Sequence, residues 1–552
     1  MNSQATLRVI PIGGLGEFGM NLMIYELPDS MIVIDCGMMF PDAATLGVDA
    51  VIPDMTYIFE RSEKLAAVFL THGHEDHIGA IPFLLEKIDV PVYGTPLTLG
   101  FVEDKLDEFR MKADLRTLVP RQVVRAGSFE VEPIHVTHSI VDAVAFGIRT
   151  SVGTIIHTGD FKFDPTPIKG KPTDLGRLAA YGDEGLLLLV SDSTNAIVAG
   201  YSRSERVVGG AMEQVFAKAK GRILVTTFAS HIDRIQQAID LAQRYRRKVH
   251  FLGRSVIDNV ATAERLGYLR IPREARSHQA RPADDDPAST VVITSGTQGE
   301  PNSSLARIAL NEHKALQLEP GDVVILSSRT IPGNERAVAH VIDHLFRRGA
   351  DVIYDEIPDI HVSGHACQEE LKTLVNLARP KFFIPMHGSY RHLIRHAELA
   401  ALMGVGDDNI FVITNGEIVE LDRDKGVVLA DRVPAGKVFV DQQYEEVAGV
   451  VLRDRKHLAE DGFVIVVVAL DVNTGRLTRE PEIITRGLVH VDTSGEILTE
   501  VRELLVSVFA EERGDELRDP EIMQEAMRAT LKRYFRKKLG RRPMILPVVW
   551  EM

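Results

Sequence analysis

The sequence contains very little cysteine and tryptophan. Its 552 residues include two cysteines, Cys36 and Cys367, and one tryptophan. Two cysteines cannot form a disulfide framework, so we expect a reducing compartment, the cytoplasm. The first residues lack a basic stretch followed by a long apolar core, so no signal peptide is expected. The most apolar runs, such as FVIVVVAL, are too short to span a bilayer.

Positive charge is also in deficit, because the formal net charge is −15. This excludes a protein coated with positive charge for binding nucleic acid, but it leaves room for a local basic channel. Bound metal ions would add positive charge that the formal count omits. Hydrophobic residues make up 45% and charged residues 26%, which is typical of globular proteins. The length predicts about two to four domains.

Many segments share one pattern, in which an apolar, β-branched run precedes small and polar residues. Examples are SMIVIDCG, RILVTTFAS and VVITSGTQGEP. Such runs are typical of buried strands, and amphipathic segments such as IDRIQQAIDLAQRYRR separate them. The pattern predicts α/β architecture, in which polar residues beyond the strand ends converge on a crevice. After about residue 434 the pattern changes. Two predicted strands, FVIVVVAL and GLVHVD, are followed by two predicted helices and a final strand, PMILPVVWEM.

The stretch GLGEFG, residues 14–19, spells the glycine pattern of a dinucleotide-binding turn. That function requires a helix after the glycines. Here MNLMIYEL, the turn PDS and MIVID follow, which predicts a β-hairpin. We therefore interpret the glycines as a turn whose backbone lines a site.

Three histidines and two acids lie together in THGHEDHIGA, residues 71–80. The segment follows a predicted strand, LAAVFL, and precedes a predicted helix, IGAIPFLLEKI. His72 and His74 point the same way in extended backbone, and Asp76 and His77 follow at the helix start. Two imidazoles for one ion, and a carboxylate with an imidazole for a second, suit a divalent metal such as Zn²⁺. The spacing H-x-H-x-D-H therefore predicts metal binding.

Further candidate ligands stand near the ends of other predicted strands. They are His138 in IHVTHSI, Asp160 in GTIIHTGD and His387 after KFFIPM. His135 and His157 lie within their strands and rank lower. A single histidine is more often structural than a ligand, so each of these residues is a weak candidate alone.

Taken together, H-x-H-x-D-H, a distant histidine, a Gly-Asp pair and a last histidine resemble the metallo-β-lactamase superfamily. In dinuclear members the resemblance implies one ion held by His72, His74 and His138. It implies a second ion held by Asp76, His77 and His387, with Asp160 bridging the two. Asp35, at the end of MIVID, matches the family's first motif and would support the ligands from behind.

Three more motifs resemble those of the β-CASP nucleases: Asp192 in SDST, His365 in SGHA and His387 in MHGSY. In these nucleases a second α/β domain is inserted into the metallo-β-lactamase domain and closes over the metals. Longer phrases, including GGLGEFGMNL, TGDFKFDPTP and SGHACQEELK, are similar to those of the bacterial ribonuclease J family from about residue 8 onward.

The resemblance implies a metallo-β-lactamase αββα sandwich, an inserted doubly wound β-CASP domain and a small α+β C-terminal domain. The expected boundaries are 1–205 and 360–434 for the sandwich, 206–359 for the insert, 435–455 for a linker and 456–552 for the terminal domain. In this family the terminal domain builds dimers, so a homodimer or homotetramer is expected, together with partners in an RNA-decay complex.

The implied activity is a metal-dependent ribonuclease acting on single-stranded RNA, with 5′→3′ exonuclease and endonuclease modes. It would prefer 5′-monophosphate ends and serve mRNA decay and rRNA maturation. The implied cofactors are two divalent ions per subunit, Zn²⁺ or Mn²⁺, and a structural Ca²⁺ near Asp49 and Asp441.

Side-chain proton transfer alone contributes only about 10²–10⁴-fold, so the chemistry needs the metals. Our hypothesis is that a hydroxide held between two ions attacks the phosphorus, with Asp76 and Asp160 fixing it. His365 would stabilise the developing charge or protonate the leaving oxygen. Asp192 would orient a histidine, as carboxylates behind metal sites do.

Phosphate recognition is expected from residues at the strand ends of the insert. The candidates are Ser230, His231, Arg234, Ser327, Ser328, His361, Ser363, Gly364 and His365. For the serines a turn or capping role is about as common. The family leads us to expect Ser-Asn-x-His-Arg after RILVTTF, whereas residues 229–234 read ASHIDR, so individual contacts there stay open.

Three alternatives remain. One is a β-CASP DNA nuclease, since no residue pattern reads a 2′-hydroxyl group. Another is a metal-dependent hydrolase of small thioesters or lactams, which the large insert disfavours. The third is a scaffold without catalysis, which the intact set of ligand positions disfavours.

Overall fold

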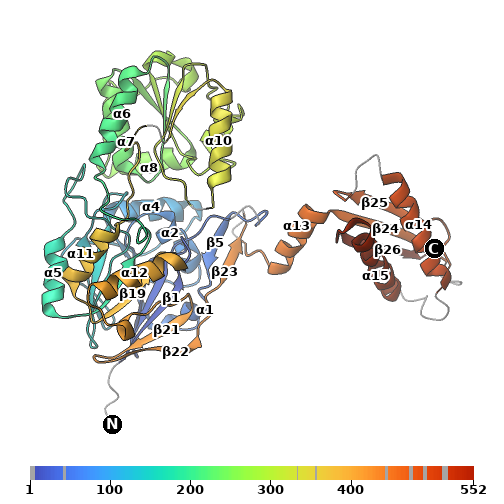
Figure 1. Cartoon of the computed structure of the whole chain (residues 1–552), viewed down its shortest axis with the longest axis horizontal. Helices are drawn as coiled ribbons and strands as arrows, with labels where there is room; N and C mark the ends of the chain where they lie inside the picture. The colour runs from blue at the N-terminus through green and yellow to red at the C-terminus, as the bar shows by residue number, and fades with distance from the viewer. Residues whose placement is uncertain are drawn as a thin grey trace, which may run out of the picture. The chain divides into compact units, whose positions relative to one another are not determined.

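The computed structural model describes residues 6–41, 45–331, 333–354, 357, 359–441, 445–471, 476–488, 494–511 and 520–551. The chain forms two compact units (Figure 1). One contains Met1–Met39 and Ile52–Lys437, and the other contains Phe40–Val51 and Val438–Met552. Within the described residues, every helix is too short or too polar to cross a membrane.

The first unit contains an eight-stranded sheet. In spatial order its strands are β22 (Gly426–Arg432), β21 (Glu417–Leu421), β1 (Leu7–Gly13), β3 (Leu22–Glu26), β4 (Met31–Ile34), β6 (Leu65–Phe69), β7 (Val92–Gly94) and β8 (Leu115–Thr117). Strands β3 and β4 pair antiparallel, with Met23 opposite Ile34. This confirms the hairpin predicted after GLGEFG and excludes a dinucleotide-binding helix at that place.

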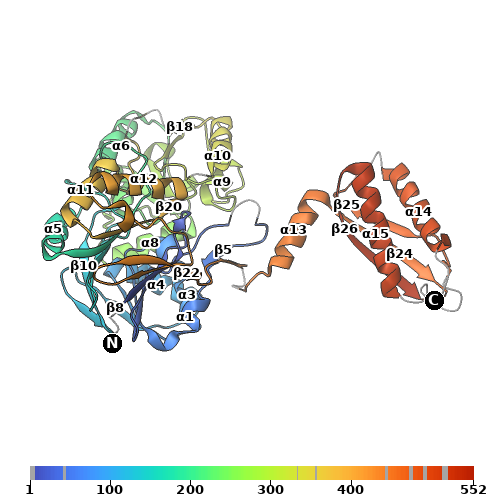
Figure 2. The same ribbon diagram turned by 60° about the horizontal axis from the view of Figure 1, so that its bottom comes forward.

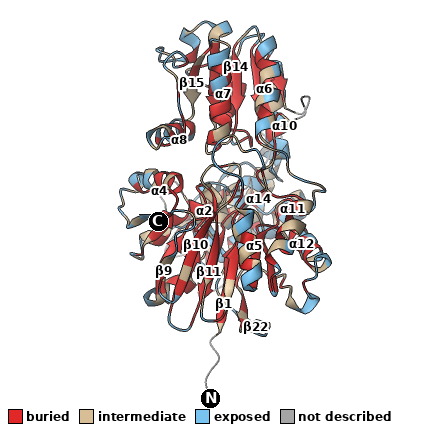
Figure 3. Cartoon of the chain, turned by 90° about the vertical axis from the view of Figure 1, so that its left-hand side faces the viewer, coloured by how far each residue is buried: buried red, intermediate tan, exposed pale blue. Residues whose placement is uncertain are grey.

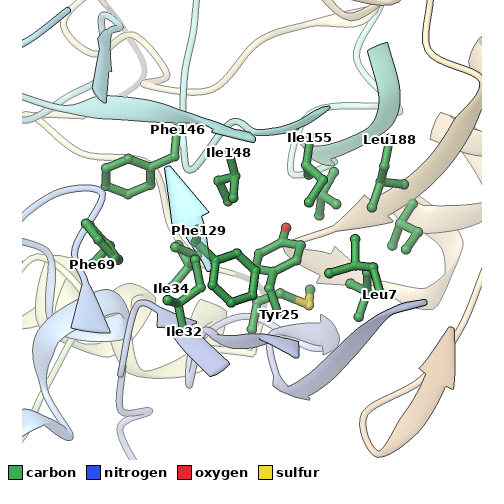
Figure 4. Packing of buried hydrophobic residues seen from close by; sticks show 14 of the residues in the cluster. Leu7, Tyr25, Ile32, Ile34, Phe69, Phe129, Phe146, Ile148, Ile155 and Leu188 are labelled. Carbon is green, nitrogen blue, oxygen red and sulfur yellow. The ribbon is translucent and has the colours of Figure 1, made fainter. Parts of the chain in front are cut away.

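A six-stranded sheet packs face to face against the first. Its strands are β19 (Phe382–Met386), β13 (Leu186–Asp192), β12 (Thr154–His157), β11 (Val144–Arg149), β10 (Phe129–His135) and β9 (Val124–Ala126). Leu7, Tyr25 and Ile34 of the larger sheet meet Phe129 and Ile148 of the smaller one in a buried core (Figure 4). The alternation of inward residues along each strand supplies this core.

Helices cover the outer faces of the two sheets. α5 (Leu175–Glu184), α11 (Gln368–Ala378) and α12 (Tyr390–Leu402) pack on the six-stranded sheet through a second cluster that includes Tyr181, Leu371 and Leu399. α4 (Pro96–Glu108) lies beside β7 and β8 of the other sheet. The result is the predicted αββα sandwich.

An inserted domain leaves the sandwich after β13 and returns before β19, two strands that pair in parallel. Its parallel sheet has the order β15 (Lys248–Leu252), β16 (Thr290–Thr294), β14 (Ile223–Thr226), β17 (Val323–Leu326) and β18 (Asp351–Ile353). Helices α6 (Arg206–Lys218) and α7 (Ile232–Arg244) lie on one face and α10 (Glu335–Arg347) on the other (Figure 1). The strands are almost wholly buried, whereas the helices are exposed on their outer sides (Figure 3). This confirms the predicted doubly wound insert.

The second unit contains a three-stranded sheet of β25 (Glu482–Arg486), β24 (Phe463–Leu470) and β26 (Met544–Glu551). α14 (Ser494–Glu511) and α15 (Pro520–Leu539) pack against it, as the sequence predicts (Figure 2). The strand predicted at GLVHVD is wrong for residues 487–488, since the strand lies just before them at Glu482–Arg486; residues 489–492 lie outside the described part. The segment 435–455, expected as a linker, holds β23 (Lys437–Val440) and the start of α13 (Gly449–Asp461).

The helix predicted over IGAIPFLLEKI is replaced by two short helices, α2 (Glu75–Ile78) and α3 (Ile81–Leu85). The backbone N–H of Ala80 donates to the carbonyl of Cys36 at 2.9 Å, not to the preceding turn. Pro82 then lacks the N–H that a continuous helix would need. The break lets the residues around His77 approach the strand end at Cys36.

Candidate metal centre and nucleic-acid interface

The seven predicted metal ligands lie in two overlapping groups. One group is His72, His74, His138 and Asp160; the other is Asp76, His77, Asp160 and His387. In each group the candidate ligand atoms lie within 4.8 Å of one another. Their positions come from loops that follow β6, β10, β12 and β19, so four strand ends build the site. Asp160 belongs to both groups, as the predicted bridging position requires.

The tautomers of the first group are fixed by hydrogen bonds behind the rings. His138 Nδ1 donates to the carbonyl of Gly364 at 2.7 Å, so its Nε2 carries the lone pair. Thr71 Oγ1 donates to Asp35 and accepts from His72 Nδ1 at 3.0 Å, which leaves the lone pair of His72 on Nε2. His138 Nε2 lies 3.3 Å and His72 Nε2 lies 3.0 Å from His74 Nδ1.

This convergence fits a divalent cation. Burial keeps the pKa values of His72 and His138 well below their usual range, and the surroundings of His74 lower its pKa to about 4. The Nε2 lone pairs of His72 and His138 therefore converge on His74 Nδ1, and all three rings favour the neutral form. Nearby, Asp160 Oδ1 is buried and has no hydrogen-bond partner. A buried carboxylate oxygen of this kind costs free energy unless a cation or donor meets it.

The charges of the second group fit a divalent cation. Burial alone would lower the pKa of His387, but Asp160, Asp192 and Asp76 raise it to about 10. Burial opposes the ionisation of Asp76, yet the charges of His77 and His387 hold its pKa well below the usual value. His387 Nε2 lies 3.2 Å from Asp76 Oδ2, and His77 Nε2 lies 3.3 Å from Asp160 Oδ2. A divalent ion would take over the positive charge that protons otherwise provide.

Asp35 supports the ligands from behind. Its Oδ2 accepts from His77 Nδ1 at 2.7 Å, and its Oδ1 accepts the backbone N–H of Thr71 at 2.8 Å. Both Asp35 and His387 have positive φ values, +62° and +54°, which are uncommon for residues other than glycine. Such strained positions occur where function fixes the backbone. The arrangement would suit the supporting role that the sequence predicts for Asp35, and that role stays a prediction.

Four further residues hold the site and escaped the sequence analysis. Thr194 Oγ1 lies 2.7 Å from His387 Nδ1, and Asn21 Nδ2 donates to the carbonyl of Asp76 at 3.0 Å. Thr71 binds Asp35 and His72, as described above. A Cβ on Gly37 would lie 1.6 Å from the carbonyl oxygen of Asp76, so only glycine fits there. The flanking motifs GGLGEFGMN, DCG and SDST were the available signal.

The glycine-rich turn does line the site, as we interpreted it. The carbonyl of Gly14 accepts the backbone N–H of His387 at 3.0 Å, and Leu15 pairs with Gly388. The turn therefore fixes the backbone of a predicted ligand.

His365 lies beside the predicted ligands, paired with Asp192. Its Nδ1 is 2.8 Å from Asp192 Oδ2, and 20% of its side chain is exposed. Burial would lower its pKa, but Asp192 and Asp160 raise it above the usual value. His365 is thus held by Asp192 beside the cluster, with part of its side chain exposed.

The predicted RNA contacts divide into buried and accessible residues. Arg234 is fully buried and binds both carboxylate oxygens of Glu205 at 2.8 Å. It also donates to the carbonyl of Ser327 and to His361 Nδ1, at 2.6 and 3.0 Å, which leaves the proton of His361 on Nε2. Ser327 is buried, and its hydroxyl donates to the carbonyl of Ile360. Ser327 therefore supports this group from within.

His231 lies in the same group, 3.5 Å from Glu205, with both ring nitrogens buried and without a hydrogen-bond partner. Ser230 precedes His231 in the loop after β14, and Ser328 follows β17; both are half-buried. Ser363 and Gly364 belong instead to the segment beside His365. Contacts thus join Arg234 with His231, Ser327 and His361 in one place, whereas Ser363, Gly364 and His365 lie at the predicted metal centre.

The remaining candidates lie apart from this centre. His157 contacts the hydroxyl of Tyr25 at 3.0 Å, and His135 binds the carbonyl of Lys171 at 2.7 Å. Asp49 and Asp441 belong to the second unit, where the backbone N–H of Asp49 donates to the carbonyl of Val440 at 2.8 Å. The Ca²⁺ site there stays a prediction. Cys36 and Cys367 are both free and buried.

The fold and this site define a metal-dependent hydrolase of the metallo-β-lactamase class with a β-CASP insert. Known families match accordingly: the metallo-β-lactamase superfamily over residues 15–200, the ribonuclease J β-CASP domain over 220–345, the Zn-dependent metallo-hydrolase RNA specificity domain over 350–412 and the ribonuclease J C-terminal domain over 450–552.

Relatives match over nearly the whole chain. Ribonuclease J2 of Bacillus subtilis is 39% identical, with 99% of both chains covered. Ribonuclease J of Helicobacter pylori is 38% identical, covering 99% of this chain and 80% of that protein. A crystal structure of a protein of unknown function from Enterococcus faecalis shares the fold, with a TM-score of 0.52, 15% identity, and coverage of 77% of this chain and all of that one. The chain belongs to the ribonuclease J family and is a metal-dependent ribonuclease.

Proposed function

We propose that the protein degrades single-stranded RNA from its 5′ end in the 5′→3′ direction, with endonucleolytic cleavage as a second mode. The observation that carries this proposal is the pair of ligand groups sharing Asp160, next to the His365–Asp192 pair. Two ions would fill the groups, Zn²⁺ or Mn²⁺, because imidazoles and carboxylates suit both.

When bound, two divalent ions lower the pKa of water and stabilise charge on attacking and leaving oxygens. The residues of the chain set the geometry around them. His72, His74 and His138 would hold one ion, Asp76, His77 and His387 the other, and Asp160 both. Asp35 and Thr194 orient the rings of His77 and His387.

His365 would donate its proton to the leaving oxygen. Asp192 favours this role because its carboxylate accepts from Nδ1, which leaves Nε2–H for the substrate. The exposed part of the His365 side chain gives a phosphodiester access to that donor.

A 5′-monophosphate would bind around Arg234. Arg234 fixes His361 as an Nε2–H donor, and its guanidinium sits at the start of α7. His231 Nδ1, which is buried without a hydrogen-bond partner, would donate to or accept from a ligand placed there, while Nε2 lies 3.5 Å from Glu205. Ser230 and Ser328 would add hydroxyl donors. A phosphate monoester offers several acceptor oxygens to such a group.

The domain division at residues 205, 359 and 434, the homodimer or homotetramer, the RNA-decay partners and a cytoplasmic location are proposals as well. They rest on the family resemblance and, for the location, on the two cysteines of the chain.

The test uses 5′-monophosphorylated single-stranded RNA, labelled at its 5′ end, with Mn²⁺ and separately with Zn²⁺. Release of labelled mononucleotide from the first time points supports the 5′→3′ exonuclease. Longer labelled fragments without mononucleotide overturn that mode and leave the endonuclease. The DNA of equal sequence is the control, and faster cleavage of DNA than of RNA overturns the choice of substrate.

A further inference from the structure

One buried lysine contacts both segments that join the sandwich to the insert. The outgoing segment, residues 193–205, follows β13, and the returning segment, residues 359–367, precedes α11. Lys162 Nζ donates to the carbonyl of Arg203 at 3.0 Å in the first and to that of Ser363 at 3.2 Å in the second. Only 1% of the Lys162 side chain is exposed. A buried ammonium group needs such acceptors, so these contacts fix both segments.

The returning segment carries His365. Asn195 donates to the hydroxyl of Ser363 at 2.8 Å and to the carbonyl of His365 at 3.0 Å. The backbone N–H of His365 in turn donates to the Ser363 hydroxyl at 3.2 Å. Lys162 therefore holds the backbone at the residue on which the placement of His365 depends.

The other side of Lys162 leads to the group around Arg234. Asp164 Oδ2 lies 3.8 Å from Lys162 Nζ and accepts the backbone N–H of Glu205 at 2.9 Å. Glu205 binds Arg234 through both carboxylate oxygens. A continuous set of contacts thus runs from the proposed 5′-phosphate group to the proposed proton donor.

We propose that Lys162 is a positioning residue for His365. Its ammonium group holds the returning segment against the outgoing one, so that the His365 ring meets the reacting phosphate. This inference rests on the proposed role of His365. Misplacement of a reacting group by about 1 Å costs on the order of 10²-fold in rate, which sets the expected size of the effect.

The test is a double-mutant cycle on RNA cleavage, using Lys162→Met, His365→Ala and both together. Methionine keeps most of the side-chain volume and removes the donors. We expect Lys162→Met to lower kcat by about 30–100-fold in the native background and by less than about 3-fold in the His365→Ala background. Lys381→Met is the matched control, since Lys381 Nζ also donates to a carbonyl, that of Arg423 at 2.6 Å, on the surface. Its kcat should stay within about 2-fold of native.

Equal losses in both backgrounds overturn the inference, because a general structural defect would lower both rates alike. If Lys162→Met cleaves RNA with the kcat of the native protein, the inference is also overturned. If Lys162→Met does not fold, Lys162→Gln, with a shorter neutral donor, replaces it in the same cycle with the same criteria. Failure of the native protein to cleave RNA would instead contradict the proposed function, so the two failures are distinct.

Discussion

His365 Nδ1 lies 2.8 Å from Asp192 Oδ2, at the open side of the cluster of predicted metal ligands. The contact engages Nδ1, and 20% of the His365 side chain is exposed. His365 is absent from both ligand groups that share Asp160 with His72 or His77. Asp192, His365 and His387 also form a third group with Asp160, whose candidate ligand atoms lie within 4.8 Å of one another. Activity and metal content must therefore be measured together to distinguish a proton donor at His365 from a metal ligand.

Replacement of His365 by alanine should lower kcat by about 10²–10⁴-fold while leaving the metal content unchanged. The reason is that the variant loses the proton donor but keeps all seven predicted ligands. Steady-state kinetics and elemental analysis of the same preparation measure the two effects. Loss of activity and metal together would show that His365 belongs to the metal set.

Replacement of Asp192 by asparagine should move the alkaline limb of the pH–rate profile to lower pH. Although burial lowers the pKa of His365, Asp192 raises it above its usual value, and asparagine removes that charge. An acid is lost as the pH rises through its pKa, so a lower pKa brings the loss at lower pH. An unchanged alkaline limb would argue that another group donates the proton.

Replacement of His361 by alanine should reduce the preference for 5′-monophosphate over 5′-hydroxyl ends, measured as the ratio of kcat/KM values. The variant removes the Nε2–H donor that Arg234 fixes. One lost hydrogen bond to a charged group is worth about 1.5–3 kcal/mol, which corresponds to roughly 10–150-fold in the ratio. His250→Ala is the control, because His250 is occupied by Asp285 at 2.8 Å within the insert. An equal ratio in the two variants would remove His361 from the pocket.

Replacement of Asp233 by asparagine should stabilise the protein above neutral pH. Burial raises the pKa of Asp233 to about 7, and its Oδ1 has no hydrogen-bond partner. A carboxyl group whose pKa is raised in the folded state destabilises the fold when it ionises. Ionisation therefore costs stability progressively from about pH 4, the unfolded pKa, to about pH 7.

Urea unfolding at pH 5 and pH 8 measures this effect. The gain of Asp233→Asn should be about 1–3 kcal/mol at pH 8 and about a third of that at pH 5. Asp240→Asn, an exposed position of the same helix, is the control. A gain that is equal at both pH values would contradict the assignment of the buried charge.

The sequence predicted the metal centre more completely than the surrounding contacts. The H-x-H-x-D-H spacing places four candidate ligands on one strand-to-helix turn, and strand-end positions bring in His138, Asp160 and His387. Spacing cannot show what lies behind the rings, because Thr71, Thr194 and Asn21 act through contacts between distant segments. Their residue types are common and carry no pattern of their own.

The errors of fold prediction have local causes. The helix expected over IGAIPFLLEKI breaks at Ala80, where Cys36 captures the backbone N–H. Of the strand expected at GLVHVD, residues 487–488 are not in a strand, and EIITR just before them pairs with β24, with Ile484 opposite Ile465. EIITR is itself β-branched, and pairing with β24 sets its extent.

The central claim is that the groups sharing Asp160 bind two divalent ions that are needed for RNA cleavage. The most direct measurement titrates chelator-treated protein with Mn²⁺, and separately with Zn²⁺, while cleavage of 5′-monophosphorylated RNA is followed. We expect no cleavage without metal and full activity after two ions bind per subunit at this centre. His74→Ala should bind one ion fewer per subunit and lose the activity. Full cleavage by the metal-free protein, or by protein with one ion per subunit, would contradict it.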